Sequence, residues 1–275
     1  REEIEKIIYF YNLKKLENFS PIQEGIENTN YIIKVDNTKY ILTIFEKRVK
    51  EDDLPFFCEL ITKLNNSGFK CPKPLLNKEN SPISNFNNKK LTILTFINGK
   101  SKENLTTENC KDIGIHAAKM HNLTSGLSIN RKNSLSVESW RKIFTNIKEP
   151  CLKIHKDLPK LIENNLDDVE KNWPLKLPSG IIHADLFKDN IIFDKNKVNG
   201  IIDFTFSCNE FYAFEIAICF NALCFDGHKN NLSFNVTKAK NFIDGYSSVR
   251  KISDEEKDKI KILSQGAALR FLLTR

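Results

Sequence analysis

The sequence lacks a long hydrophobic run and a secretory signal. Its longest apolar stretch, Phe211 to Phe225, is interrupted by Glu215 and Asn221. Because a helix needs about 20 apolar residues to cross a bilayer, this stretch predicts a buried helix, and we expect no membrane partner. The chain begins at Arg1 without a methionine and stops inside an expected helix. We therefore expect incomplete ends, above all at the C-terminus.

Signals of a disulfide framework and of nucleic-acid binding are also missing. The seven cysteines are odd in number, irregularly spaced and without a Cys-x-x-Cys pair, which is typical of reduced, mostly buried thiols in a cytoplasmic protein. The 42 Lys and Arg exceed the 35 Asp and Glu only modestly and form no dense block. A basic stripe interleaved with aromatic residues would be expected of a nucleic-acid-binding protein, so we predict no nucleic-acid partner. The net charge of +7 suits a small anionic ligand.

The residue pattern changes near position 98. Before this point β-like runs prevail, and after it helical spacing prevails. The sequence predicts an α+β fold with two lobes, a small β-rich N-lobe at residues 1–97 and a larger, mainly helical C-lobe at residues 98–275. The expected helices lie at 2–13, 53–66, 107–121, 136–171 and from 211 onward, and the expected strands at 31–35, 40–45, 91–97, 180–183, 190–193 and 198–204.

The most informative stretch is His183-Ala-Asp-Leu-Phe-Lys-Asp-Asn190, followed by Ile201-Ile-Asp-Phe204. It matches the kinase catalytic-loop pattern His-x-Asp-x-x-x-x-Asn, then a strand pair and an Asp-Phe element. Asp185 can orient an attacking hydroxyl and accept its proton, while Asn190 and Asp203 offer oxygen ligands to Mg²⁺. Phosphoryl transfer needs mainly positioning and charge neutralisation. We predict Asp185 as the catalytic base, Asn190 and Asp203 as metal ligands, and ATP and Mg²⁺ as cofactors.

Other interpretations of these residues exist. Taken alone, Asp185 could cap a turn and Asp203 could sit in a surface hairpin, but their joint order and spacing favour a kinase. A hydrolase metal centre on His183 and Asp185 would need further ligands, and the other histidines have no ligand-like spacing. We expect His183 to hold the loop, and His116 and His121 to be core or surface residues.

A turn-rich segment, residues 23–30, lies ahead of the first β-like run. Gly25 permits a close backbone approach, and Asn28, Thr29 and Asn30 can donate hydrogen bonds to phosphate. We predict that this loop covers the phosphates of a nucleotide, although a simple hairpin turn would have the same composition.

At these motifs the sequence resembles the aminoglycoside phosphotransferase superfamily, and within it the bacterial homoserine kinase branch. The resemblance extends over nearly the whole chain and also rests on Tyr40–Glu46, Leu54–Phe57 and Ala217–Phe225. It implies a protein-kinase-like fold with ATP in the cleft, a nucleotide-binding N-lobe, and a C-lobe that carries catalysis and binds the acceptor.

The resemblance implies further roles and one departure. Thr95, Phe96 and Ile97 would border the adenine. Thr43 occupies the place where many relatives carry a Lys or Arg that contacts the phosphates, so this contact lacks an assigned residue. Lys39 and Lys47 are the nearby candidates. Glu59, on the following helix, would lack its usual ion-pair partner, and Glu215 would be a structural residue behind the catalytic loop.

The resemblance implies Mg-ATP-dependent phosphorylation of the side-chain hydroxyl of L-homoserine, in threonine biosynthesis. Alternatives are another small acceptor, such as an aminoglycoside, a choline-like amino alcohol or a sugar, and a catalytically weak nucleotide-binding scaffold. An amino-acid substrate needs a partner for its carboxylate and one for its ammonium group. Arg270, and Glu210 or Asp226, are candidates by location, but surface charge is the favoured interpretation of each.

Overall fold

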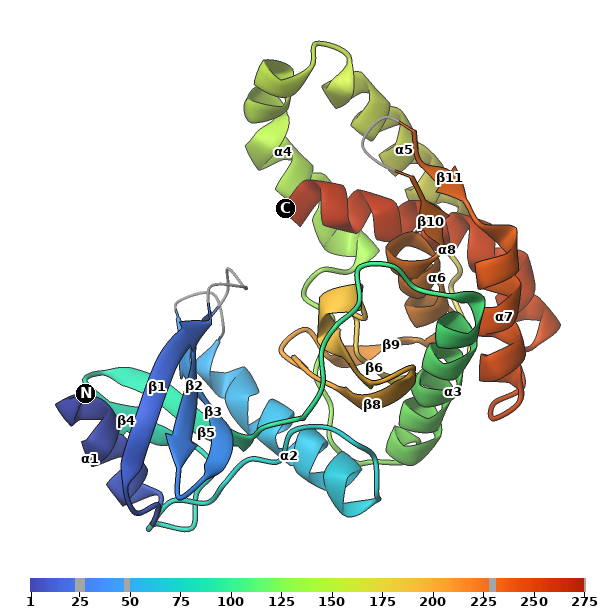
Figure 1. Ribbon diagram of the computed structural model, residues 1–275. Coiled ribbons are helices and arrows are strands. Elements are labelled where there is room, and N and C mark those ends of the chain that lie inside the picture. The colour runs from blue at the N-terminus through green and yellow to red at the C-terminus, as the bar shows by residue number, and fades with distance from the viewer. Residues whose placement is uncertain (23–27, 47–49, 228–230, 275) are drawn as a thin grey trace. The chain divides into compact units, whose positions relative to one another are not determined.

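The computed structural model describes residues 1–22, 28–46, 50–227 and 231–274. These residues form two compact units, one built on a β-sheet and one mainly helical (Figure 1). The predicted α+β fold with a β-rich N-terminal region is confirmed. The first unit comprises Arg1–Lys100, Ile192–Lys195 and Asn199–Thr205, and the second Ser101–Ile191, Asn196–Val198 and Phe206–Arg275.

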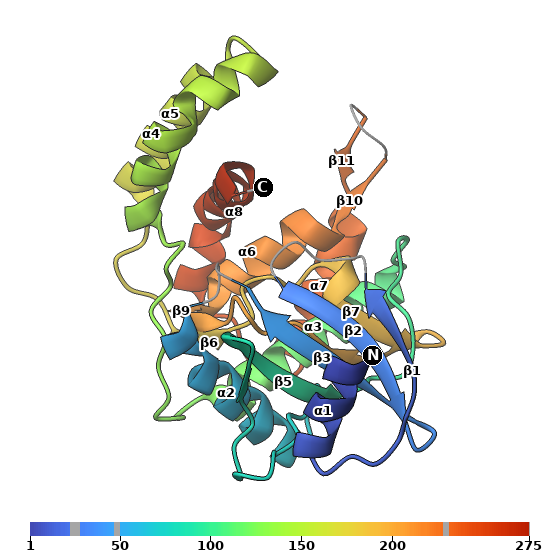
Figure 2. The same ribbon diagram turned by 90° about the vertical axis from the view of Figure 1, so that its left-hand side faces the viewer.

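The first unit contains a five-stranded antiparallel sheet (Figure 2). Asp36 and Asn37 have positive φ values of 47° and 63°, as a two-residue type I′ hairpin requires. Asn87 and Asn88 repeat this turn with φ values of 49° and 60°. The strands, hydrogen-bonded in the order β1-β2-β3-β5-β4, are β1 (Leu16–Ile22), β2 (Asn28–Val35), β3 (Thr38–Phe45), β4 (Ser84–Phe86) and β5 (Lys89–Thr95).

The core of the first unit lies between this sheet and helix α1 (Glu2–Phe10). Ile4, Ile7 and Ile8 share one face of the helix, because residues three and four apart lie on the same side. They pack in one cluster with Leu42 and Ile93 of the sheet. A second helix of this unit, α2 (Leu54–Asn66), begins with a proline in its first turn, where the missing N–H costs no hydrogen bond.

The sequence did not predict strands β1 and β4. β1 contains Pro21, which removes a backbone donor and is tolerated because β1 is an edge strand. β4 has only three residues, too few to show an alternating pattern. Both strands form because β2 and β5 offer open edges to pair with.

The second unit consists of six helices and short β-pairs among its described residues. The helices are α3 (Thr107–Thr124), α4 (Val137–Ile154), α5 (Leu158–Asn172), α6 (Tyr212–Leu223), α7 (Val236–Ser247) and α8 (Asp254–Thr274). The strands are β6 (Ser179–Ile182) paired with β9 (Cys208–Phe211), and β10 (Phe225–Asp226) paired with β11 (Ser233–Phe234). The strands β7 (Ile191–Asp194) and β8 (Lys197–Ile201) form the expected hairpin.

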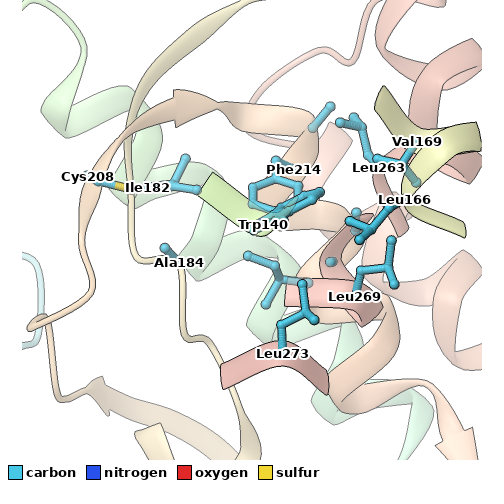
Figure 3. Packing of buried hydrophobic residues seen from close by; sticks show 14 of the residues in the cluster. Trp140, Leu166, Val169, Ile182, Ala184, Cys208, Phe214, Leu263, Leu269 and Leu273 are labelled. Carbon is cyan, nitrogen blue, oxygen red and sulfur yellow. The ribbon is translucent and has the colours of Figure 1, made fainter. Parts of the chain in front are cut away.

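Four helices of the second unit share one hydrophobic core (Figure 3). Trp140 of α4 and Phe214 of α6 are fully buried at its centre, beside Leu166 of α5 and Leu263 of α8. Ala184 of the predicted catalytic loop belongs to the same cluster. The loop is therefore anchored on the core of this unit.

Every cysteine lies within the described residues, and all seven are buried and unbridged there. Across the described parts of the chain, none of the helices combines the length and the apolar character that crossing a membrane requires.

Helices α3 and α7 pack with their backbones in contact. A Cβ atom added at Gly114 of α3 would lie 2.2 Å from the carbonyl oxygen of Phe242, and one at Gly245 of α7 would lie 2.0 Å from the carbonyl oxygen of Lys111. Backbone atoms of a packed helix cannot rotate aside as a side chain can. Each helix therefore needs a glycine where it meets the other.

Gly245→Ala is expected to lower the free energy of unfolding by about 1–3 kcal/mol, the usual cost of overpacking. Urea denaturation followed by circular dichroism measures this change. Ser247→Ala on the exposed side of α7 serves as the control and is expected to change stability by no more than about 0.5 kcal/mol. Equal stability of the two variants would contradict the close helix contact.

Candidate active site

The predicted catalytic loop runs from the end of β6 to the start of β7. His183 follows β6 directly, and Asn190 ends a single 3₁₀ turn, Lys188–Asn190, immediately before β7. His183, Asp185 and Asn190 are exposed by only 0%, 7% and 7%. Polar residues buried to this degree need hydrogen-bond partners, and these partners define the geometry of the loop.

The backbone of the loop has an unusual conformation at Ala184, where φ is 64°. The left-handed region costs an L-residue with a side chain roughly 1–2 kcal/mol, so neighbouring groups must hold it. Glu215 Oε2 of α6 accepts hydrogen bonds from the N–H of His183 and, at 3.1 Å, from the N–H of Ala184. The Arg270 guanidinium of α8 donates to the carbonyl of Ala184. The peptide groups on both sides of Ala184 are thus held by buried, charged side chains.

The structure brings Asp185 and Asn190 together. The Asn190 side-chain nitrogen donates to the carbonyl oxygen of Asp185 at 2.8 Å and to Asp185 Oδ2 at 3.2 Å. His183 Nδ1 accepts the N–H of Asp185 at 3.3 Å, which agrees with the expected role of His183 in holding the loop. The amide nitrogen of Asn190 is hydrogen-bonded within the loop. Its amide oxygen is the atom that could bind a cation.

Asp203 follows β8 and is exposed. Its backbone is left-handed, with φ of 59°. Its Oδ1 accepts hydrogen bonds from the hydroxyl of Thr205 at 2.5 Å and from the N–H of Thr205 at 3.3 Å. Asp203 belongs to the first unit, whereas Asp185 and Asn190 belong to the second. Joint coordination of a metal by these residues stays a prediction.

Several of the predicted nucleotide-binding residues meet on strands β2 and β3. Asn30 lies opposite Thr43, and the Thr43 hydroxyl donates to Asn30 Oδ1 at 2.8 Å. The Thr29 hydroxyl donates to Glu46 at 2.9 Å. Asn28 has a buried Oδ1 that accepts no hydrogen bond from the residues the structure describes. Thr43 and its neighbours Asn28, Thr29 and Asn30 are therefore neutral polar residues, and the charged pair at this end of the sheet is Glu46 with Lys89 of β5, 2.9 Å apart.

Gly25 and Lys47, which the sequence places near the phosphates, lie outside the described residues. Lys39 is described, and its ammonium group lies 5.4 Å from the centre of the Phe96 ring. It stands four residues before Thr43 on the same strand, a separation of roughly 13 Å at about 3.3 Å per residue. Lys39 is thus at the other end of β3 and does not replace a lysine at Thr43.

The predicted adenine-bordering segment begins at the end of β5. The N–H of Thr95 donates to the carbonyl of Lys73 at 2.9 Å, and the Thr95 hydroxyl accepts the N–H of Lys73 at 2.8 Å. Phe96 and Ile97 follow and are partly buried.

On α2, Glu59 forms an ion pair with Lys63 of its own helix at 3.3 Å, so its ion pair is local.

Behind the loop, Glu215 heads a chain of buried polar groups in the second unit. His121 Nε2 lies 4.0 Å from Glu215 Oε2, and His121 Nδ1 lies 2.6 Å from the hydroxyl of Tyr246. Arg250 donates to the same hydroxyl at 3.3 Å and to Glu256 at 3.0 Å. Helices α3, α6, α7 and α8 each contribute one member to this chain.

The environment of Glu215 keeps it ionised although it is fully buried. Burial alone raises its pKa, but the neighbouring His121 and His183 rings and the hydrogen bond from the N–H of Ala184 outweigh this effect, and the pKa lies below its ordinary value. An ionised carboxylate accepts stronger hydrogen bonds than a neutral acid. The charge state of Glu215 thus strengthens its hold on the loop.

Sequence reasoning identified only part of this arrangement. The structural role implied for Glu215 is present, but the expectation that Arg270 is a surface charge is wrong, because Arg270 is only 2% exposed. A usable signal was Glu215 itself, a charge inside an apolar run, since a buried charge needs partners. No local pattern marks Arg270 as a neighbour of the loop, or Arg250 and Glu256 as members of the buried chain behind His121.

Comparison with known proteins agrees with this geometry. The model of the phosphotransferase enzyme family matches residues 18–250. The chain belongs to this family. It is 39% identical over 273 residues to a homoserine kinase of Mesorhizobium japonicum, with 99% of this chain and 84% of the relative covered. It is 40% identical over 273 residues to a homoserine kinase of Xanthobacter autotrophicus, with the same shares covered.

A solved structure of amicoumacin kinase hAmiN, in complex with AMP-PNP, Ca²⁺ and Ami, has the same fold as this phosphotransferase. The TM-score is 0.75 at 15% sequence identity, with 99% of this chain and 84% of that chain covered.

The stability of this phosphotransferase is expected to fall as the pH drops below about 6.5. Burial lowers the pKa of His121, against the raising effect of Glu215. Below the unfolded-state pKa of about 6.5, the unfolded chain takes up a proton at this residue that the folded protein does not. The free energy of unfolding then decreases by at most about 1.4 kcal/mol per pH unit from this group.

His121→Asn keeps a polar group near Tyr246 but does not titrate, so its stability is expected to decline less steeply between pH 6.5 and 5.5. Urea denaturation at pH 7.5, 6.5 and 5.5 measures the slope. His155→Asn, at a side chain that is 65% exposed, is the control and should follow the wild type. Parallel slopes for all three proteins would show that His121 is not the titrating group.

Proposed function

We propose that this phosphotransferase is a homoserine kinase. It transfers the γ-phosphoryl group of ATP to the side-chain hydroxyl of L-homoserine, giving O-phospho-L-homoserine and ADP, a step of threonine biosynthesis. The choice of acceptor is supported by the 39% and 40% identity to two homoserine kinases over nearly the whole chain. The single observation that carries the chemistry is the hydrogen-bonded pair of Asp185 and Asn190 on a buried loop.

Asp185 is the catalytic base in this proposal. Its carboxylate accepts the proton of the homoserine hydroxyl as the new oxygen–phosphorus bond forms and the bond from the γ-phosphorus to the bridging oxygen of ATP breaks. Asn190 fixes the carboxylate by its hydrogen bond to Oδ2, and His183 fixes the backbone of the same residue. A base held at both its side chain and its backbone stays aligned with the hydroxyl, and alignment supplies much of the rate in phosphoryl transfer.

The donor atoms of Asn190 and Asp203 fit Mg²⁺. Asn190 has its amide oxygen left over, and Asp203 has a carboxylate of which one oxygen is used by Thr205. Mg²⁺ takes one or two such oxygen ligands from the protein and others from nucleotide phosphates. When bound there, the ion would neutralise charge on the β- and γ-phosphates.

The nucleotide is proposed to lie on the first unit, along the residues that the sequence assigns to it. The side-chain amides of Asn28 and Asn30 would donate to the phosphates, Thr29 and Thr43 would line the same site with their hydroxyl protons bonded to Glu46 and Asn30, and Gly25 would allow the backbone to approach the phosphates. Thr95, Phe96 and Ile97 would border the adenine. Since the N–H of Thr95 is already bonded to Lys73, a backbone donor to the base would come from Phe96 or Ile97.

The three charged candidates for the amino-acid end of homoserine already have partners in the structure. Glu210 accepts a hydrogen bond from Asn133 at 2.9 Å. Asp226 is hydrogen-bonded to Lys238 and Asn235, and Arg270 is hydrogen-bonded to Ala184.

The cytoplasmic location expected from the sequence stays a prediction.

Asp185→Asn is expected to lower kcat with L-homoserine by about 10²–10⁴-fold, the range of general-base contributions, while Mg-ATP binding is retained. ADP release is measured with L-homoserine, L-serine, choline, methylthioribose and kanamycin as acceptors. Asp189→Asn, at an exposed carboxylate of the same loop, is the matched control and should keep wild-type turnover. Turnover with a different acceptor only, or none with any of them, would overturn the proposed substrate.

Asn190→Ala and Asp203→Asn are each expected to raise the Mg²⁺ concentration needed for half-maximal turnover by at least about 10-fold, since even outer partners of metal ligands typically contribute 10–100-fold to affinity. The assay titrates Mg²⁺ at fixed ATP. Asp194→Asn, at the exposed end of β7, is the control. An unchanged Mg²⁺ requirement in either variant would remove that residue from the metal site.

A further inference from the structure

Arg270 is a buried arginine with a specific target in the catalytic loop. It lies on α8, is 2% exposed, and its guanidinium lies 4.6 Å from the centre of the Phe271 ring and 5.6 Å from that of Phe206. Its Nη1 donates to the carbonyl oxygen of Ala184. A buried cation is costly unless its surroundings compensate it. The hydrogen bond from this buried cation therefore holds the Ala184 carbonyl in place.

Ala184 is held from two directions. Its N–H is bonded to Glu215 Oε2 of α6, while its carbonyl is bonded to Arg270 of α8. An anion on the donor side and a cation on the acceptor side complement the polarity of the two peptide groups. Figure 3 shows Ala184 beside the same hydrophobic cluster that contains Leu269 and Leu273 of α8. The helix that carries Arg270 is thus itself anchored next to the loop.

The peptide group that Arg270 contacts is the one that joins Ala184 to Asp185. Its orientation sets the direction in which Asp185 leaves the backbone, and Ala184 has a conformation that a non-glycine residue rarely adopts. If this peptide group rotated toward an ordinary conformation, the carboxylate of Asp185 would move away from its position beside Asn190.

We propose that Arg270 is a positioning residue for phosphoryl transfer, which keeps the Ala184–Asp185 peptide group oriented so that Asp185 faces the acceptor hydroxyl. This inference rests on the proposed function of Asp185. Arg270 lies 85 positions after Asp185 in the chain. It acts on Asp185 through the backbone of the loop. This role also replaces the idea that Arg270 binds the substrate carboxylate.

Loss of positioning differs from loss of stability or of substrate binding in its kinetic signature. A misplaced base slows the chemical step, since a displacement of about 1 Å can cost about 10²-fold in rate. It leaves ATP binding unchanged, because the nucleotide-binding residues are elsewhere. A purely structural arginine would instead lower the folded fraction and leave the turnover of the folded protein unaltered.

The test compares Arg270→Gln and Arg270→Lys with Arg250→Gln. Arg250 is the matched control, because it is also a largely buried arginine of the second unit, paired with Glu256, but it does not contact the loop in any interaction the structure describes. Steady-state kinetics with ATP and L-homoserine are measured at a temperature where each variant is folded by circular dichroism. Thermal denaturation gives the stability of each variant.

For Arg270→Gln we expect a kcat about 10–100-fold below wild type, with the KM for ATP within about 2-fold. Arg270→Lys keeps a charge and a donor but loses the planar guanidinium beside Phe271, so its kcat should lie between those of the wild type and Arg270→Gln. Arg250→Gln should lose stability and keep kcat within about 2-fold. A near-wild-type kcat for Arg270→Gln, or an equal loss of kcat in both glutamine variants, would overturn the proposal.

A readout independent of the acceptor separates this inference from the proposed function. Hydrogen exchange of the peptide covering residues 182–187 is expected to be faster in the Arg270 variants than in wild type, and unchanged in Arg250→Gln. If the wild type does not phosphorylate homoserine, the proposed function fails while the exchange data still decide whether Arg270 holds the loop. Wild-type exchange rates in both Arg270 variants would refute the holding role even if homoserine is the substrate. If Arg270→Gln does not fold, Arg270→Lys supplies both measurements.

Discussion

The structure of the candidate site depends on one buried carboxylate, that of Glu215. It accepts hydrogen bonds from two successive backbone N–H groups, those of His183 and Ala184, and so supports a left-handed residue directly before the candidate base. A fully buried anion is unfavourable unless it is well satisfied. The two N–H groups satisfy Oε2, and His121 of α3 adds a polar neighbour whose Nε2 lies 4.0 Å from the same oxygen. The conformation of a short loop is thus coupled to the packing of α6, which carries Glu215, and of α3, which carries His121.

This coupling explains why the helical unit is built so tightly. Gly114 and Gly245 bring the backbones of α3 and α7 together, and α3 carries His121 while α7 carries Tyr246. Trp140 and Phe214 fill the core behind α6 and α8. Hydrogen-bonded chains of buried groups are sensitive to small shifts, and dense packing with little free volume limits such shifts.

The candidate phosphate site of the first unit differs from the loop of the second unit, because no buried charged side chain holds it in the contacts described. This site, on β2 and β3, offers neutral amide and hydroxyl groups, among them the bonded pair of Thr43 and Asn30. Lys39 lies at the far end of its strand against Phe96, and the charge of Lys89 is paired with Glu46. Neutral donors can position phosphates by hydrogen bonds, but they add no positive charge. In such a site the neutralisation of phosphate charge depends more heavily on Mg²⁺.

The amino-acid sequence by itself determined the candidate loop at residues 183–190, the hairpin that follows it, the buried character of the helix carrying Glu215, and the β-rich and helical parts of the chain. These features arise from local spacing, which a linear pattern records. Strands β1 and β4 were missed, because an edge strand with a proline and a strand of three residues form only through pairing with a neighbour. Likewise, only the tertiary structure decided that Arg270 is buried on Ala184 rather than exposed, and that Tyr246, Arg250 and Glu256 stand behind His121. Contacts between residues far apart in the chain depend on how helices pack, and no local pattern encodes that packing.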